Sequence, residues 1–199
     1  MGAKPMVYRD GSAGRLLPAD FRGGGPFTTA AITGLWSFVF TAQGNTGPNA
    51  PANAIGLPDG AVADAGYVTW HDDGTEIMNS GRAPVSGSFC MGVWKQIGPR
   101  TYRLNHWALS WLANYPFPPG TPPSWSSLPG GADDAFQPVG PTNIQETITL
   151  DRSGNSYTGT FVLTQYQNNG SGKPINDISG AQIVGILEGT VTATRITVQ

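Results

Sequence analysis

The sequence contains one cysteine, few charged residues and no long hydrophobic run. A lone Cys90 excludes an internal disulfide framework and says little about the redox compartment. Only 12% of the 199 residues are charged, the net charge is -2, and Lys and Arg form no cluster. Because nucleic acids and anionic membranes are bound through basic patches, we expect neither partner. No apolar run approaches the roughly 18 residues of a membrane span, so we expect no membrane insertion.

Motifs of the commonest enzyme classes are also missing. The chain has no Gly-x-Ser-x-Gly sequence, which removes the usual serine hydrolase signature. Glycine-rich residues 170–173 precede Pro174, which cannot continue into the helix interior that a phosphate-binding loop requires. His71 and the following Asp-Asp-Gly form a turn sequence, and two histidines in the whole chain argue against a zinc site. We therefore expect no metal and no cofactor.

The composition that remains is typical of one globular domain with long loops. Hydrophobic residues make up 39% of the chain, and 28 glycines and 17 prolines interrupt it. Residues 1–32 show no periodicity and predict an irregular N-terminal arm, followed by the main domain over residues 33–199. The scarcity of Lys and Glu beside abundant Gly, Asn and Thr resembles secreted bacterial proteins. We expect a secreted or periplasmic location on that basis, although residues 1–12 contain no signal-peptide core.

Residues 66–107 form the part of the chain with the clearest organisation. Four β-rich runs, at 67–71, 75–78, 88–95 and 100–107, are joined by short Gly, Pro and Asp connections. Such spacing predicts an antiparallel meander. In the last run Tyr102, Leu104, His106 and Ala108 share one face, because strand side chains alternate with a period of two. The register around Glu76 and Met78 stays open.

Four further runs predict strands with the same alternation. They cover residues 34–41, 143–151, 157–167 and 183–198, and no helical periodicity of any length appears between them. Eight sequential antiparallel strands satisfy their edges best by closing on themselves. We therefore predict an all-β fold, a single-domain eight-stranded antiparallel up-and-down β-barrel with long loops. A two-sheet sandwich is the alternative.

Residues 109–141 combine many prolines with aromatic side chains. Loops longer than about 12 to 15 residues are often lids or binding loops, and the aromatic content argues against simple disorder. This composition favours a lid over one end of the barrel. A partner-binding surface and an ordinary packed loop are the alternatives.

Polar side chains on the apolar face are the candidates for chemistry. His106 and Glu146 both point inward by alternation, on strands that are adjacent in sequence. A carboxylate beside an imidazole in an apolar barrel can act as a general acid and base, and Tyr102 could add a hydrogen bond. The alternatives are a satisfied internal polar pair, or a Glu146 that lies in water at the rim.

Other inward residues are candidates for lining a ligand pocket, since a small barrel has little core apart from its lumen. Inward aromatic residues are equally expected in a plain core, and a buried thiol is usually inert. Polar side chains in this set could instead bond to the backbone. The candidates are Trp36, Phe38, Trp70, Met78, Cys90, Trp94, Phe161, Gln165 and Arg195.

Gly34-Leu35-Trp36, at the start of the first predicted strand, resembles the Gly-x-Trp signature of the lipocalins and the wider calycin group. The resemblance implies that Arg195 packs over Trp36 once the barrel closes, where a flat guanidinium can stack on the indole. The Thr-Asp-Tyr type motif and the C-terminal helix of lipocalins are absent. The overall organisation is also similar to allene oxide cyclase-like barrels. Both resemblances imply a cavity for a hydrophobic small molecule.

Three functions follow as hypotheses. The first is binding of a small hydrophobic or aromatic molecule in the lipocalin manner. The second is a cofactor-independent isomerase, cyclase or lyase that uses His106 and Glu146. The third is a structural or interaction module with a solid barrel. The sequence leaves the oligomeric state open, a homo-oligomer included.

Overall fold

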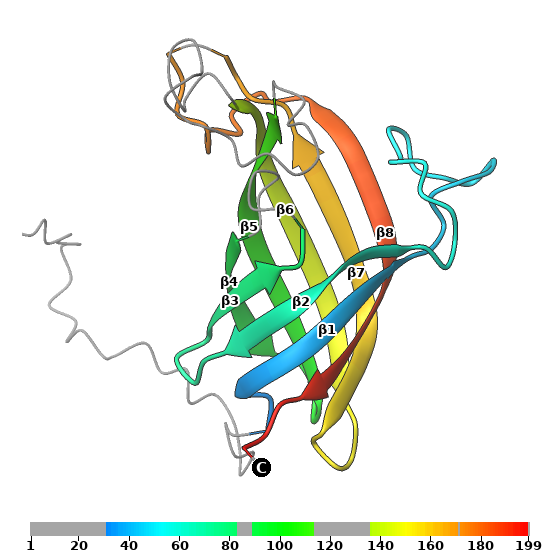
Figure 1. Cartoon of the computed structure of the whole chain (residues 1–199), viewed down its shortest axis with the longest axis vertical. Helices are drawn as coiled ribbons and strands as arrows, with labels where there is room; N and C mark the ends of the chain where they lie inside the picture. Colours follow the sequence, from blue (N-terminus) through cyan, green and yellow to red (C-terminus); the bar gives the residue numbers. More distant parts are fainter. Residues whose placement is uncertain (1–30, 83–88, 114–135, 171, 199) are drawn as a thin grey trace, which may run out of the picture.

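The chain folds into one closed antiparallel barrel of eight strands, which confirms the predicted fold class. The computed structural model describes residues 31–82, 89–113, 136–170 and 172–198. The strands are β1 (Gly34–Ala42), β2 (Val62–Trp70), β3 (Thr75–Ser80), β4 (Phe89–Gln96), β5 (Thr101–Ala113), β6 (Phe136–Leu150), β7 (Ser156–Tyr166) and β8 (Ile183–Arg195). Each strand pairs with its neighbours in sequence, and β8 returns to β1 (Figure 1). In these ranges the chain has no helix with the length and apolar character to cross a membrane.

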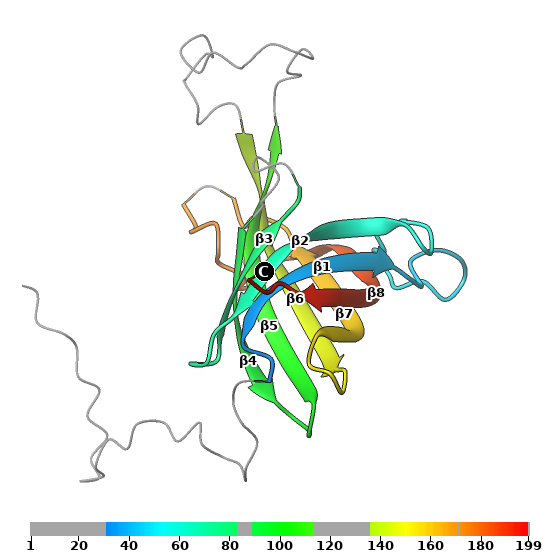
Figure 2. The same cartoon turned by 60° about the horizontal axis from the view of Figure 1, so that its bottom comes forward.

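Short turns set the antiparallel order. Between β2 and β3, Gly74 has φ of 86°, a left-handed conformation that glycine adopts without strain. The Asp73 carboxylate accepts hydrogen bonds from the backbone N–H and the hydroxyl of Thr75, at 2.8 and 2.6 Å. The Asp-Asp-Gly sequence thus closes a hairpin, as its turn chemistry predicts. Figure 2 shows the strands arranged around the barrel axis.

Alternation along each strand decides which side chains enter the lumen. On β5 the buried residues are Tyr102, Leu104, His106 and Ala108, the face that the sequence predicts. On β3 the same rule buries Glu76 and Met78 and leaves Ile77 37% exposed. This pattern settles the register that the sequence leaves open.

Aromatic side chains fill much of the lumen. At the end of the barrel where β8 finishes, the ring centroids of Trp36 and Tyr157 lie 5.0 Å apart, and Trp70 and Trp94 lie 5.7 Å apart. Farther along β1, the rings of Phe40 and Phe161 stack at 4.5 Å. The core of the protein is therefore the barrel interior itself.

Arg195 and Trp36 close this end of the barrel together. They are direct partners between β8 and β1, and the Arg195 guanidinium carbon lies 4.2 Å from the centre of the Trp36 ring, which confirms the predicted contact. Three guanidinium nitrogens donate to the backbone carbonyls of Ala31, Thr33 and Gly154. The guanidinium of Arg195 is thus engaged in contacts that stabilise the fold.

The predicted bounds of the loop at 109–141 are wrong at both ends. β5 continues to Ala113 and β6 begins at Phe136, so this hairpin reaches beyond its neighbours (Figure 2). Pro138 and Pro141 lie outside the β6–β7 ladder, which begins at Thr142; beyond it the chain after β7 still bonds to β6 through Asn168 N–H and the Val139 carbonyl, at 2.7 Å. The remaining part of the proposed lid, residues 114–135, lies outside the described residues, as does the arm over residues 1–30.

Candidate functional site

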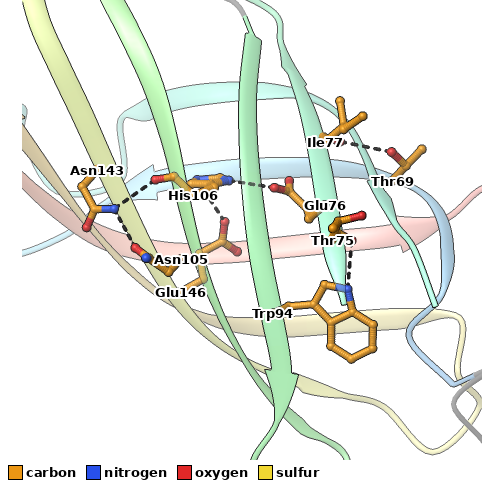
Figure 3. A network of polar contacts seen from close by, with 9 residues as sticks. All are labelled: Thr69, Thr75, Glu76, Ile77, Trp94, Asn105, His106, Asn143 and Glu146. Atoms are coloured by element: carbon orange, nitrogen blue, oxygen red, sulfur yellow. Dashed lines mark hydrogen bonds and ion pairs between the residues drawn. The ribbon is translucent and has the colours of Figure 1, made fainter. Parts of the chain in front are cut away.

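A buried histidine between two buried carboxylates is the most distinctive polar feature of the lumen. Glu76 Oε2 on β3 lies 3.3 Å from His106 Nδ1 on β5, and Glu146 Oε1 on β6 lies 3.8 Å from His106 Nε2. The side chains of Glu76 and His106 are 0% exposed and that of Glu146 is 4% exposed. We call Glu76, His106 and Glu146 the buried triad (Figure 3).

Gly92 on β4 makes the triad geometrically feasible. It is the direct cross-strand partner of both Glu76 and His106, so it lies between them in the sheet. A Cβ at this position would come within 2.5 Å of His106 Cβ and 2.8 Å of Glu76 Oε2. The missing side chain therefore lets residues from two non-adjacent strands meet.

Burial and charge act against each other on His106. Burial by itself lowers the pKa of the imidazole, but the hydrogen bond to Glu76 and the charges of Glu146 and Glu76 outweigh it. The pKa of His106 is therefore raised above its ordinary value of 6.5. The protonated imidazolium is the form that two flanking carboxylates stabilise.

Glu146 is shifted toward its neutral form. Burial raises the pKa of this carboxyl most, the charge of His106 lowers it and the charge of Glu76 raises it, and together these effects bring the pKa to about 7. A buried carboxyl with a pKa of about 7 beside an imidazole whose pKa is also raised can exchange a proton with it. This is the electrostatic signature that general acid and base groups share, and structural pairs share it too.

Apart from Asn168 Oδ1, three buried side-chain polar atoms have no hydrogen-bond partner among the described residues. They are His106 Nε2, Glu76 Oε1 and Trp70 Nε1, and Trp70 is the direct cross-strand partner of Glu76. The separation of 3.8 Å between His106 Nε2 and Glu146 Oε1 is too long for a hydrogen bond. The lumen thus contains hydrogen-bonding atoms that have no partner among the described residues.

Hydrogen bonds from neighbouring strands hold the backbone of the triad in place. Asn143 Nδ2 donates to the carbonyl of His106 at 3.1 Å and to the side-chain oxygen of Asn105 at 2.6 Å (Figure 3). The carbonyls of Ile77 and Thr75, on either side of Glu76, accept from Thr69 Oγ1 at 3.3 Å and from Trp94 Nε1 at 3.0 Å. The strands that carry Glu76 and His106 are therefore fixed from both sides.

Of the three predicted catalytic residues, the structure brings two together. His106 and Glu146 are diagonal neighbours across β5 and β6, because the direct partner of His106 is Ile144. Tyr102 lies four residues along β5 from His106, among the rings of Trp70 and Trp94. Burial raises the pKa of Tyr102, which keeps its hydroxyl protonated. Its position is that of a packing residue at the Trp36 end of the barrel.

The predicted ligand-binding residues divide into two groups. Trp36, Phe38, Trp70, Met78, Cys90 and Phe161 are buried in the lumen, as alternation predicts. Three polar members instead have their bonding groups engaged by backbone carbonyls. Gln165 Nε2 donates to the carbonyls of Tyr166 at 2.8 Å and Pro141 at 3.1 Å. The Trp94 N–H donates to His71 as well as Thr75, and Arg195 bonds as described above.

Cys90 is an inert member of the core. Burial first, and then the charges of Glu76, Asp64 and Glu146, raise the pKa of its thiol to about 12. A thiol that stays protonated is a poor nucleophile and a poor metal ligand. Within the described part of the chain, no cluster of three or more His, Cys, Asp or Glu side chains could hold a metal ion.

Glu76 is the functional candidate that the sequence analysis missed. The sequence did contain an indication of this role, because Glu76 has the same parity as Met78, which is a predicted lumen residue. The apolar Ile77 between them suggested the opposite face equally well. Only the pairing of β3 with β4, together with that of β4 with β5, places the carboxylate beside His106.

Comparisons of the chain with protein-family models and with curated proteins each return no match. The lipocalin resemblance is consistent with the closed eight-stranded barrel and with the Arg195–Trp36 contact, and it concerns the fold alone. A barrel of this kind is compatible with ligand binding.

Proposed function

We propose that the barrel binds a small, mostly hydrophobic molecule in its lumen, beside the buried triad. The inward side chains around His106 are largely apolar, which suits such a ligand. The observation that carries the proposal is His106 Nε2, a fully buried polar atom without a partner among the described residues. An unsatisfied buried polar group costs about 1 to 3 kcal/mol, so a ligand that supplies the missing bond is favoured.

The direct test is to identify what the protein carries. Small molecules would be extracted from the purified protein and analysed by untargeted mass spectrometry, with the His106→Ala variant as comparison. His71→Ala serves as the matched control, because His71 lies at the β2–β3 turn and outside the triad. We expect a specific molecule to co-purify with the wild type and the His71 variant and to be depleted from the His106 variant.

Added back, that molecule must raise the melting temperature of the emptied protein, because a ligand that binds only the folded state stabilises it by mass action. Equal recovery from all three proteins would indicate nonspecific carry-over. Recovery of no molecule, with no shift from any added candidate, would contradict the proposal and favour an internal water as the partner of His106.

A second candidate function is acid–base catalysis on the bound molecule, as a cofactor-independent isomerase, cyclase or lyase. The observation that favours it is a buried imidazole with a raised pKa, His106, that lies 3.8 Å from a buried carboxyl with a pKa of about 7, Glu146. Such a pair can remove a proton from a carbon next to a carbonyl and return it elsewhere.

Turnover separates the two functions. The co-purified molecule would be incubated with the protein in D2O, and exchange of carbon-bound hydrogen would be followed by NMR. A catalyst accelerates exchange and loses this activity in Glu146→Gln, whereas a carrier binds without exchange and changes affinity only modestly in that variant. Binding without any exchange would contradict catalysis and leave the carrier in place.

A further inference from the structure

The ring nitrogens of His106 have different surroundings. Nδ1 lies 3.3 Å from Glu76 Oε2, and this hydrogen bond raises the pKa of His106, as a bond donated by the ring does. Nδ1 therefore carries a hydrogen. Whether Nε2 carries one as well depends on whether the ring is neutral or cationic.

The charge of Glu146 also favours the cationic form of the His106 ring. Glu146 Oε1 lies on the Nε2 side of the ring at 3.8 Å, so carboxyl groups flank the ring from β3 and from β6. The raised pKa of His106 agrees with this arrangement. Nε2 thus presents an N–H that is close enough to Glu146 to be stabilised, yet too far from it to be satisfied.

We propose that the molecule in the lumen presents a neutral oxygen acceptor, such as a ketone or ester carbonyl, to the Nε2–H of His106. This inference rests on the proposed function and adds the chemical class of the ligand. Hydrogen bonds from charged donors are stronger than neutral ones, so this contact contributes both affinity and orientation.

A negatively charged head group does not suit the same position. Glu76 and Glu146 already place two carboxylates around one imidazole, and both are buried. A third carboxylate would add repulsion and desolvation in a medium where charges are weakly screened. The site therefore selects a carbonyl over a carboxylate on a hydrophobic skeleton of the same shape.

The preference for an acceptor depends on pH. The groups that interact with His106 are Glu76 from β3 and Glu146 from β6; the nearby thiol of Cys90 on β4 has a pKa of about 12. Tyr157 on β7 and Tyr102 on β5 have raised pKa values and stay protonated. The titrations of His106 and Glu146 therefore change the site. As pH rises through the pKa of His106, Nε2 loses its hydrogen and becomes an acceptor.

Three bicyclic probes of similar shape test the inference on the intact chain. They are 1-indanone with a neutral carbonyl, indane with no polar atom, and indane-1-carboxylate with an anion. Binding to the wild type would be measured by isothermal titration calorimetry and ligand-observed NMR at pH 6 and pH 9. At pH 6 we expect 1-indanone to bind about tenfold more tightly than indane, with the carboxylate the weakest. At pH 9 the advantage of 1-indanone should shrink.

The His106→Leu variant removes the donor, and 1-indanone and indane should then bind equally. If this variant does not fold, the comparison of the two pH values in the wild type provides the same readout. Equal binding of 1-indanone and indane to the wild type at pH 6, or tighter binding of the carboxylate, would overturn the inference and leave ligand binding intact. Failure of all three probes to bind at any pH would contradict the proposed function and this inference together.

Discussion

Glu76 and His106 meet inside the barrel across an intervening strand, with 3.3 Å between Glu76 Oε2 and His106 Nδ1. They belong to β3 and β5, and the residue between them on β4 is Gly92. Contact across a whole strand is unusual for side chains of this size, since direct partners on adjacent strands are already about 5 Å apart. The glycine is the reason that the contact exists.

Replacement of Gly92 by alanine should therefore destabilise the protein. The added methyl would overlap His106 Cβ and Glu76 Oε2, and overpacking of this kind costs about 1 to 3 kcal/mol. The free energy of unfolding would be measured by urea denaturation. Gly56→Ala is the matched control, because nothing lies within 4 Å of a Cβ at that position. Equal stability of the two variants would show that Gly92 is not the spacer of the triad.

Glu76→Gln should lower the pKa of His106. The carboxylate of Glu76 raises that pKa both by its hydrogen bond and by its charge, so without it the effect of burial is opposed only by Glu146. The titration of the His106 ring would be followed by NMR, with His71 in the same protein as an internal reference. An unchanged titration of His106 would mean that Glu76 does not set its protonation state.

The stability of the folded protein should fall as pH rises from 5 to 8. Glu146 has a folded pKa of about 7 against an ordinary 4.5, and the folded pKa of His106 is raised above 6.5. In this window the folded state holds more protons than the unfolded state, so the free energy of unfolding decreases with pH. The contribution of His106 is complete below 6.5 and is lost as pH passes its folded pKa.

The Glu146→Gln variant removes the contribution of Glu146 to this effect. A shift from 4.5 to about 7 corresponds to about 3 kcal/mol of stability lost across the window, and glutamine cannot titrate. Chemical denaturation at several pH values would give both curves. Asp151, whose pKa is about 2, stays ionised throughout this range. A wild-type curve that is flat or rises between pH 5 and 8 would contradict the charge assignment of the triad.

Arg195→Met should weaken the closure of the barrel. Methionine keeps much of the packing on Trp36 but leaves the backbone carbonyls of Ala31, Thr33 and Gly154 without their donor. We expect a loss of about 2 kcal/mol or more in the free energy of unfolding. The exposed Arg152→Met is the control and should change little. A loss no larger than that of Arg152→Met would show that water replaces the guanidinium at no cost.

Cys90 should be unreactive in the native protein. Its thiol is buried and has a pKa of about 12, so a disulfide reagent at pH 8 finds neither access nor thiolate. Reaction would be followed by absorbance in buffer and in denaturant, and full labelling is expected only after unfolding. Rapid labelling without denaturant would mean that the lumen opens near β4 on the time scale of the assay.

Much of the fold was predictable because strand alternation is a local property. Tyr102, His106, Glu146 and Trp36 point inward as their positions in the predicted strands require, and the Arg195–Trp36 contact was expected from the Gly-Leu-Trp resemblance. The loop boundaries were wrong because proline density indicates turns only on average. Pro138 and Pro141 both pair with β5, at a part of β6 that lies outside the β6–β7 ladder.

The sequence by itself determined the all-β class and the parity of each strand, since a period of two follows from backbone geometry. It also placed an imidazole and a carboxylate on the inner face. Only the tertiary structure decided that Glu76 bonds to Nδ1, that Glu146 faces Nε2 and that Gly92 leaves the gap between β3 and β5. The reason is that the relative register of β3, β4, β5 and β6 depends on barrel closure, which joins residues far apart in the chain.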